Sequence, residues 1–171
     1  QKISVIANLG LIAKAIGILR SYGADAHVYI PGVGTISGIT AGNYLDSAGT
    51  TSASVDNPVG LVVDSFGSIN ATQGTTANKP ILRQSGGNYS WQFDGSNDYL
   101  ALSAPLFQMS DDHCVIAGVS KTASASDKYV FAVANSASAT PLCAMIVLSS
   151  DGIAKAFWRG DDAVLRFASS G

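Results

Sequence analysis

The sequence predicts an all-β fold: an antiparallel jelly-roll sandwich over residues 41–171, preceded by an apolar, helical N-terminal extension over residues 1–40. Two observations predict the sandwich. Short runs rich in β-branched and aromatic residues recur after residue 42, separated by turn clusters, which is typical of sandwiches and barrels. No ten-residue amphipathic pattern interrupts these runs, so antiparallel pairing without crossover helices is expected.

Apolar residues near the N-terminus recur at steps of three and four, which predicts a helix with one apolar stripe. The stripe consists of Ile3, Ile6, Leu9, Ile12, Ala13, Ile16 and Leu19. Lys14 interrupts a run already shorter than the ~20 apolar residues of a membrane span, so no span is expected. Two interpretations remain open: a helix that caps the sandwich, and a segment for anchoring or oligomerisation.

The stretch Pro31–Gly42 carries four glycines in twelve positions, which favours a linker. It lacks the third glycine, the following helix and the Lys-Ser/Thr pair of a phosphate-binding loop. We therefore expect a domain boundary near Gly42, with an anchor and linker before it and the sandwich after it.

The clearest strand pair is predicted at Tyr89–Phe93 and Asp98–Leu102, joined by an Asp-Gly-Ser-Asn turn. Alternation places Tyr89, Trp91 and Phe93 on one face, which should point into the core. Further strands are predicted at Leu61–Asp64, His113–Val119, Tyr129–Ala134, Leu142–Leu148, Ile153–Trp158 and Ala163–Ala168.

Several stretches resemble a known family. They are Tyr44–Thr51 (Tyr-Leu-Asp-Ser-Ala-Gly-Thr-Thr), Asn57–Asp64, Asn70–Gln73, Lys79–Leu82 and the Trp91–Leu100 segment with its Phe-Asp-Gly turn. Their order is similar to the first half of LamG-like, concanavalin A-like domains in virion proteins of tailed bacteriophages. The resemblance covers residues 41 to about 102 in motifs, and the remainder only in strand pattern.

The resemblance implies a non-enzymatic virion structural protein, such as a tail fibre, a tail-associated protein or a head fibre, located on the extracellular particle. Its implied partners are other virion proteins, further copies of itself and a host-surface polysaccharide. The N-terminal segment would then attach the domain to the particle. Two alternatives remain: a secreted or cell-surface bacterial carbohydrate-binding or adhesion module, and a non-catalytic domain of a larger glycan-degrading enzyme.

The charges argue against two function classes. The net charge is −2 and the ten basic residues are scattered, so a nucleic-acid partner is not expected. All twelve acidic residues are aspartate, and no Asp-x-Asp pair lies in a predicted strand to supply the paired carboxylates of a glycosidase. No Gly-x-Ser-x-Gly nucleophile motif is present either. We therefore expect no enzymatic activity.

Asp94, Asn97 and Asp98 place three oxygen-bearing side chains in one turn, which makes them a candidate calcium site. Ordinary turn chemistry, in which such side chains bond the local backbone, accounts for the same residues and is the interpretation we favour. No other cofactor is expected.

Glycan binding requires exposed aromatic rings beside polar groups. The best-placed candidates are Tyr99, Trp158, Arg159 and Asp161. For Trp158, packing at the end of a strand is the competing interpretation.

The cysteines and histidines suggest no reactive centre. In the sequence Asp111-Asp112-His113-Cys114, a strand would point His113 and Cys114 to opposite faces. Cys114 and Cys143 lie in apolar runs, so buried free thiols are favoured over a disulfide between them. His27 lies near two tyrosines, and a packing or surface role is expected for it.

Overall fold

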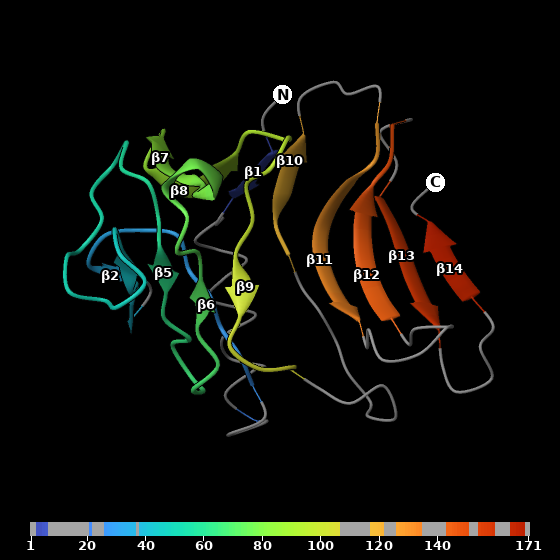
Figure 1. The fold of residues 1–171 in the computed structure, drawn as a ribbon, viewed down its shortest axis with the longest axis horizontal. Helices are drawn as coiled ribbons and strands as arrows, with labels where there is room; N and C mark the ends of the chain where they lie inside the picture. Colours follow the sequence, from blue (N-terminus) through green and yellow to red (C-terminus); the bar gives the residue numbers. More distant parts are fainter. Residues whose placement is uncertain are drawn as a thin grey trace. The chain divides into compact units, whose positions relative to one another are not determined.

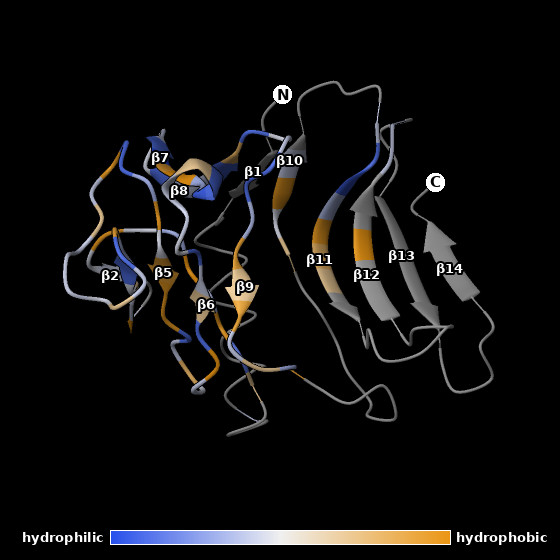
Figure 2. Cartoon of the chain, in the orientation of Figure 1, coloured by the Kyte–Doolittle hydropathy of each residue, from blue (hydrophilic) through white to orange (hydrophobic). Residues whose placement is uncertain are grey.

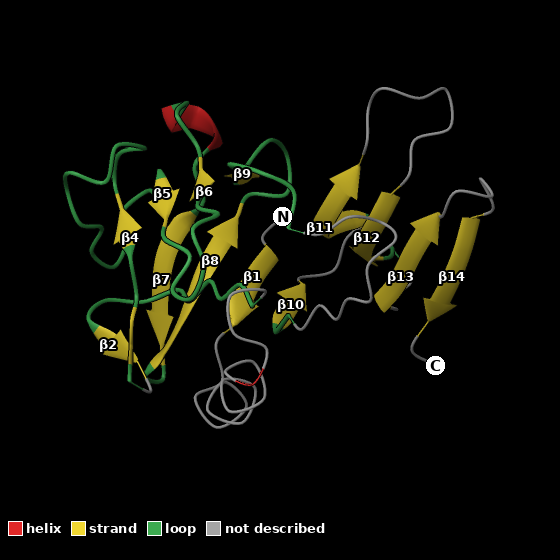
Figure 3. Cartoon of the chain, turned by 90° about the horizontal axis from the view of Figure 1, so that it is seen from below, coloured by secondary structure: helices red, strands yellow, loops and turns green. Residues whose placement is uncertain are grey.

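A computed structural model of the chain describes residues 3–6, 21, 26–36, 38–106, 117–121, 126–134, 143–150, 154–159 and 165–169. The chain divides into two compact units, one of residues 2–104 with 118–120, and one of residue 1, residues 105–117 and residues 121–171. Strands and loops make up nearly all of the described chain (Figures 1 and 3). All strand pairs with a determined register run antiparallel, so the predicted all-β class is confirmed.

The first unit contains two four-stranded sheets, with strand orders β10-β1-β8-β7 and β4-β5-β6-β9, and the small pair β2-β3. The first sheet comprises β1 (Ile3–Ile6), β7 (Ile81–Ser85), β8 (Asn88–Phe93) and β10 (Val119–Lys121). The second comprises β4 (Asn43–Tyr44), β5 (Leu61–Val62), β6 (Ala71–Thr72) and β9 (Ala101–Leu102). The pair consists of β2 (Thr35–Ile36) and β3 (Ile39–Thr40), and the 3₁₀ helix η2 spans Thr76–Asn78.

The two four-stranded sheets share one core. Leu82 of β7 and Trp91 of β8 belong to the same buried cluster as Val62 of β5 and Ala71 of β6. Figure 2 shows that β5 is hydrophobic along its length, as expected for a strand with both residues buried. Residues of both sheets therefore pack together in one buried cluster.

Strand β8 presents the core face that the alternation predicts. Trp91 is buried, and Tyr89 and Phe93 are partly buried and pack against the same cluster. This part of the prediction is confirmed.

The predicted partner of this strand is wrong. Strand β8 pairs with β7 through the turn Gly86-Gly87, with Leu82 opposite Trp91, whereas β9 pairs with β6 in the other sheet. Gly86 and Gly87 have φ angles of 56° and 80°. Positive φ at both positions suits a two-residue hairpin, because the turn then follows the strand twist. The four-residue Asp-Gly-Ser-Asn turn instead carries the chain from one sheet to the other.

The N-terminal prediction is wrong for the first residues. Ile3–Ile6 form β1, which pairs with β8 so that Ile3 lies opposite Phe93 and Val5 opposite Trp91. Three of these four residues are β-branched, which favours a strand wherever an open sheet edge accepts one. Residues 7–20, which carry the rest of the predicted helix, lie outside the described residues.

The segment before residue 42 contributes to the core. Val28, Ile30, Ile39 and Ala41 form a second buried cluster, against which Phe66 and Tyr89 pack. The glycine-rich stretch also forms the pair β2-β3. The boundary expected near Gly42 falls inside the first unit. The assignment of residues 1–40 to a separate attachment function stays a prediction.

Irregular chain covers the outer edges of two of these strands. Along β7, the N–H of Asp56 donates to the carbonyl of Leu82 and the N–H of Leu82 donates to the carbonyl of Asn57. Along β4, the N–H of Ala53 donates to the carbonyl of Asn43. These backbone groups are therefore satisfied without a further strand.

In the second unit, four strands follow one another in the order β11-β12-β13-β14. They are β11 (Lys128–Ala134), β12 (Cys143–Leu148), β13 (Ala154–Arg159) and β14 (Leu165–Ser169). Each lies within two residues of a predicted strand, so these four predictions are confirmed. The strand predicted at His113–Val119 is displaced: β10 begins at Val119, residues 117–118 are not strand, and residues 113–116 lie outside the described part.

Candidate functional site

The candidate site is the turn Asp94–Tyr99, which connects β8 to β9. Asp94 organises it: its Oδ1 atom accepts hydrogen bonds from the backbone N–H groups of Ser96, Asn97 and Asp98 at 2.7, 3.1 and 3.3 Å. The Oδ2 atom of Asp98 accepts the backbone N–H of Asp94 at 2.8 Å. The turn is therefore closed by its own carboxylates, which is the Asp-based turn chemistry favoured from the sequence.

The two carboxyl groups of the turn differ in pKa. Backbone hydrogen bonds, above all from Ser96, lower the pKa of Asp94. Partial burial and the neighbouring Asp94 charge raise the pKa of Asp98. Such a division is expected when one carboxylate accepts several N–H groups and its neighbour is desolvated beside it.

The predicted calcium ligands lie together in this turn. The Oδ1 atom of Asp94 already accepts three N–H groups, and the Asn97 amide donates to Oδ1 of Asn78 at 2.9 Å. These side chains therefore already have partners within the protein. Within the described residues there is no group of three or more His, Cys, Asp or Glu side chains suited to a metal ion. Calcium binding here stays a prediction.

Tyr99 is the last residue of this turn. The residue is 52% exposed, while its backbone is held on both sides. The N–H of Tyr99 donates to the carbonyl of Asn78 at 3.2 Å, and the buried Gln73 amide donates to the carbonyl of Tyr99 at 3.3 Å. Gln73 is itself fixed, because its Oε1 accepts the N–H of Thr75 at 2.9 Å. The result is an exposed tyrosine on a well-anchored backbone, and the turn that carries it also holds Asn97, whose amide donates to Oδ1 of Asn78.

The other predicted glycan-binding residues lie in the second unit. Trp158 and Arg159 end strand β13, where Trp158 pairs with Ala144 and Arg166. Their side chains, like the whole of Asp161, lie outside the described part of the chain. Of the four candidates, only Tyr99 has its side chain in the described part of the chain.

Asp64 joins several segments of the first unit through hydrogen bonds, and no sequence motif marks it. Its side chain is fully buried and bonds Nδ1 of His27 at 2.6 Å. It also accepts the backbone N–H groups of Val28, Phe66, Gly67 and Ile69 at 3.0–3.2 Å. Burial by itself raises the pKa of this carboxyl, but the hydrogen bonds, that of His27 foremost, outweigh burial and hold the pKa below its usual value. His27, for which a packing or surface role is expected, is thus held by its bond to Asp64.

A second missed residue is Asn43. Its Oδ1 accepts the indole N–H of Trp91 at 2.6 Å, and its amide donates to the carbonyls of Ile30 and Gly32 at 2.9 and 3.1 Å. Asn43 is 4% exposed. It therefore satisfies three buried polar groups that would otherwise lack a partner.

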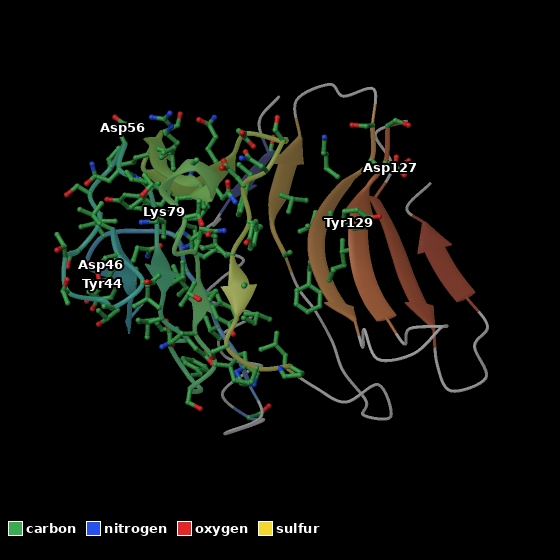
Figure 4. The ribbon with its side chains drawn as sticks, viewed as in Figure 1. Tyr44, Asp46, Asp56, Lys79, Asp127 and Tyr129 are labelled. Carbon is green, nitrogen blue, oxygen red and sulfur yellow. The ribbon has the colours of Figure 1, made fainter. Side chains whose placement is uncertain are left out.

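The motif Asp46-Ser-Ala-Gly-Thr-Thr forms a loop closed by its aspartate. The Asp46 carboxylate accepts the N–H groups of Ala48, Thr50 and Thr51 and the hydroxyl of Thr50 at 2.9–3.1 Å. These bonds, led by that of Thr50, lower the pKa of Asp46 to about 2. The Lys79 ammonium donates to the carbonyl of Leu45 at 2.8 Å, and Figure 4 shows Tyr44, Asp46 and Lys79 on the same side of the unit.

The remaining residues singled out in the sequence lie wholly or partly outside the described part of the chain. Asp111, Asp112, His113 and Cys114 lie outside the described residues, and of Cys143 only the backbone, in β12, is described. Within the described part of the chain, no helix is long and apolar enough to cross a bilayer.

Comparison with known proteins gives no match: no family model, no curated protein and no solved structure matches the chain. The turn Asp94–Tyr99 presents an aromatic face and amide groups, whereas the carboxylates of Asp46, Asp64 and Asp94 hold backbone N–H groups.

Proposed function

We propose that the chain is a non-enzymatic structural protein of a bacteriophage virion. It would be a tail fibre, a tail-associated protein or a head fibre, and its LamG-like jelly-roll domain would bind a glycan on the host surface. The antiparallel sheets of the first unit, which share one buried cluster, support the jelly-roll assignment. The resemblance of the Tyr44–Leu100 motifs to phage virion domains supports the location.

One observation carries the binding function: the exposed ring of Tyr99 on a backbone anchored by Gln73 and Asn78. An aromatic ring stacks on the apolar face of a sugar, and neighbouring amides bond the hydroxyl groups. A fixed backbone lowers the entropy lost when the ligand binds.

The role as scaffold and binder, without catalysis, is supported by how three of the described carboxylates are used. Asp46, Asp64 and Asp94 each accept at least three hydrogen bonds from the surrounding chain. A general base requires a carboxylate within reach of a substrate proton. These three are occupied in closing loops.

Location is tested by immunogold labelling of virions purified from the phage whose genome encodes the chain. Labelled particles support a virion component, and the labelled part of the particle identifies which one. Unlabelled particles, with the protein recovered from the culture medium of the bacterium, would instead support the alternative of a secreted carbohydrate-binding module.

Binding is tested on a glycan array with the whole chain and three variants. We expect Tyr99→Ala to lose most of the signal and Tyr99→Phe to retain it, because the ring supplies the stacking. Tyr129→Ala is the matched control, since Tyr129 is another exposed tyrosine, in the second unit, with 66% exposure. Equal signals from Tyr99→Ala and Tyr129→Ala would refute the role of Tyr99.

A further inference from the structure

A groove of about 390 Å³ opens on the first unit between the segment of β3 and β4 and the chain that follows β5. It is lined by Gly38, Ile39, Thr40, Gly42, Tyr44, Val63, Asp64, Ser65 and Phe66. Its volume lies at the lower end of the range of about 300–1,000 Å³ seen for small-molecule sites. It is separate from the turn at Asp94–Tyr99, with which it shares no residue.

The walls of the groove are closely joined. The N–H of Val63 donates to the carbonyl of Gly42 at 2.8 Å. A Cβ atom on Gly42 would lie 2.7 Å from the Cβ of Val63, so only glycine allows this approach. Beneath the opening, Ile39 belongs to the buried cluster against which Phe66 packs. The groove is therefore preformed in the fold.

The chemistry of the lining favours an uncharged ligand. Asp64 is the one charged residue among those that line it, and its carboxylate is fully buried and bonded to His27 and backbone N–H groups. The remaining polar groups are hydroxyls, on Tyr44, Thr40 and Ser65. The Ser65 hydroxyl makes only a long contact, 3.5 Å, to the carbonyl of Thr40.

We propose that this groove is a subsite for neutral saccharide, with room for one or two sugar rings. The partly exposed Tyr44 stacks on the apolar face of a sugar, and the Thr40 and Ser65 hydroxyls bond its hydroxyl groups. This inference rests on the proposed glycan-binding function. It adds a second contact for the same polysaccharide chain and predicts selectivity for uncharged over acidic sugars.

The test uses the whole chain with neutral disaccharides (maltose, lactose, chitobiose) and glucuronic acid as the acidic probe. Calorimetry measures affinity, and amide chemical shifts locate binding. We expect a neutral disaccharide to shift the amides of Gly38, Thr40, Ser65 and Phe66. We also expect Tyr44→Ala to weaken binding about tenfold, which corresponds to about 1.4 kcal/mol. Tyr44→Phe should bind within about twofold of the parent, and Thr40→Val, of nearly the same shape, should weaken binding several-fold.

Two results would contradict the groove as a sugar subsite while leaving glycan binding by the chain intact. In the first, a sugar binds the parent without shifting these four amides. In the second, Tyr99→Ala loses affinity for the sugar and Tyr44→Ala does not. If the parent binds none of these sugars and no glycan on the array, the proposed function and the groove fail together. The shift measurement on the parent needs no variant, so it decides the matter even if Tyr44→Ala fails to fold, as monitored by circular dichroism.

Discussion

At the scale of single residues, two buried polar side chains hold distant segments of the first unit together. Asn43 joins the chain at residues 30–32 to Trp91 of β8. Asp64 joins His27 and Val28 to the loop at residues 66–69. Their partners are up to 48 residues away in sequence, so no local pattern reveals them. Single asparagines and aspartates near strands normally predict turns.

We expect Asn43→Ala to destabilise the protein by about 3 kcal/mol, because buried donors and acceptors left without partners cost about 1–3 kcal/mol each. Three such groups are affected: the indole N–H of Trp91 and the carbonyls of Ile30 and Gly32. Urea unfolding measures the change. Asn88→Ala, at an exposed position of β8, is the control and should alter the free energy of unfolding by less than about 0.5 kcal/mol. Equal effects from the two variants would show that the buried bonds contribute little.

Asp64 makes stability depend on pH. Its pKa in the folded protein lies below its usual value, so its stabilising effect is complete above about pH 4–5 and is lost as the pH falls through the folded pKa. We expect Asp64→Asn to destabilise the protein by about 2–3 kcal/mol at pH 7. The gap between parent and variant should narrow towards pH 3, as urea midpoints at several pH values would show.

The control for this pH dependence is Asp56→Asn. Asp56 is exposed and forms a surface ion pair with Arg83, and such pairs contribute about 0–1 kcal/mol. Between pH 7 and pH 3, the free energy of unfolding of Asp56→Asn should change with pH as that of the parent does. A gap between Asp64→Asn and the parent that stays constant from pH 7 to pH 3 would contradict the role given to the carboxylate.

At the scale of elements, strands with a strong pattern could be predicted and their partners could not. The alternation of Tyr89, Trp91 and Phe93 identified β8 and its core face, since burial of one face imposes a period of two. The pairing of β8 with β7 could not be predicted, because Ile81–Ser85 has only two apolar residues. In addition, two turn sequences, Gly86-Gly87 and Asp94–Asn97, compete as the hairpin turn beside β8. The glycine pair was the stronger hairpin signal. At Ile3–Ile6, apolar residues three apart fit a helix, but pairing with β8 decided the outcome.

In the candidate site, too, the local features could be predicted from the sequence and the contacts between distant segments could not. The cluster of Asp94, Asn97, Asp98 and Tyr99 is contiguous in sequence, so its proximity was predictable. The anchoring of Tyr99 by Gln73 and Asn78 depends on the fold and was not. The groove beside Tyr44 brings together two segments about twenty residues apart, and no motif marks it.

We expect Gly86→Ala to destabilise the β7-β8 hairpin by about 1–2 kcal/mol, because an L-residue in the left-handed region carries that cost. No atom lies within 4 Å of a Cβ built at Gly86, so the effect comes from the backbone alone. Gly86→Asn should cost less, since asparagine tolerates positive φ.

Gly74→Ala is the matched control for the hairpin. Its Cβ also meets nothing within 4 Å, and its φ is not positive, so its free energy of unfolding should be unchanged or slightly raised. If Gly86→Ala and Gly74→Ala have the same free energy of unfolding by urea denaturation, the hairpin does not require the left-handed turn.

At the scale of the whole molecule, the segment before residue 42 is part of the fold as well as a proposed means of attachment. Val28, Ile30, Ile39 and Ala41 form a core cluster, and His27 and Val28 donate to Asp64. A deletion of residues 1–40 therefore cannot separate attachment from folding.

We expect a chain that begins at residue 41 to lose cooperative unfolding, and a chain that begins at residue 26 to keep it at reduced stability, because only β1 is then missing from the described strands. Thermal unfolding followed by circular dichroism distinguishes the two. Cooperative unfolding of the shorter chain, at the parent's transition temperature, would show that residues 26–40 add nothing to the core. Particle attachment is best tested with the chain that begins at residue 26, because it keeps the core cluster of Val28, Ile30, Ile39 and Ala41.

At the outer edges of β4 and β7, loops of the chain bond backbone groups of the strands. This affects whether neighbouring copies can pair edge to edge at high local concentration. A virion displays repeated copies of its surface proteins at short spacing, where any bare strand invites a neighbour to extend the sheet and polymerise. At these two edges the protein's own loops already bond the backbone groups of Leu82 and Asn43 that a neighbouring copy would need. Copies brought together at Leu82 and Asn43 would therefore meet through side chains and not by adding a strand to the sheet.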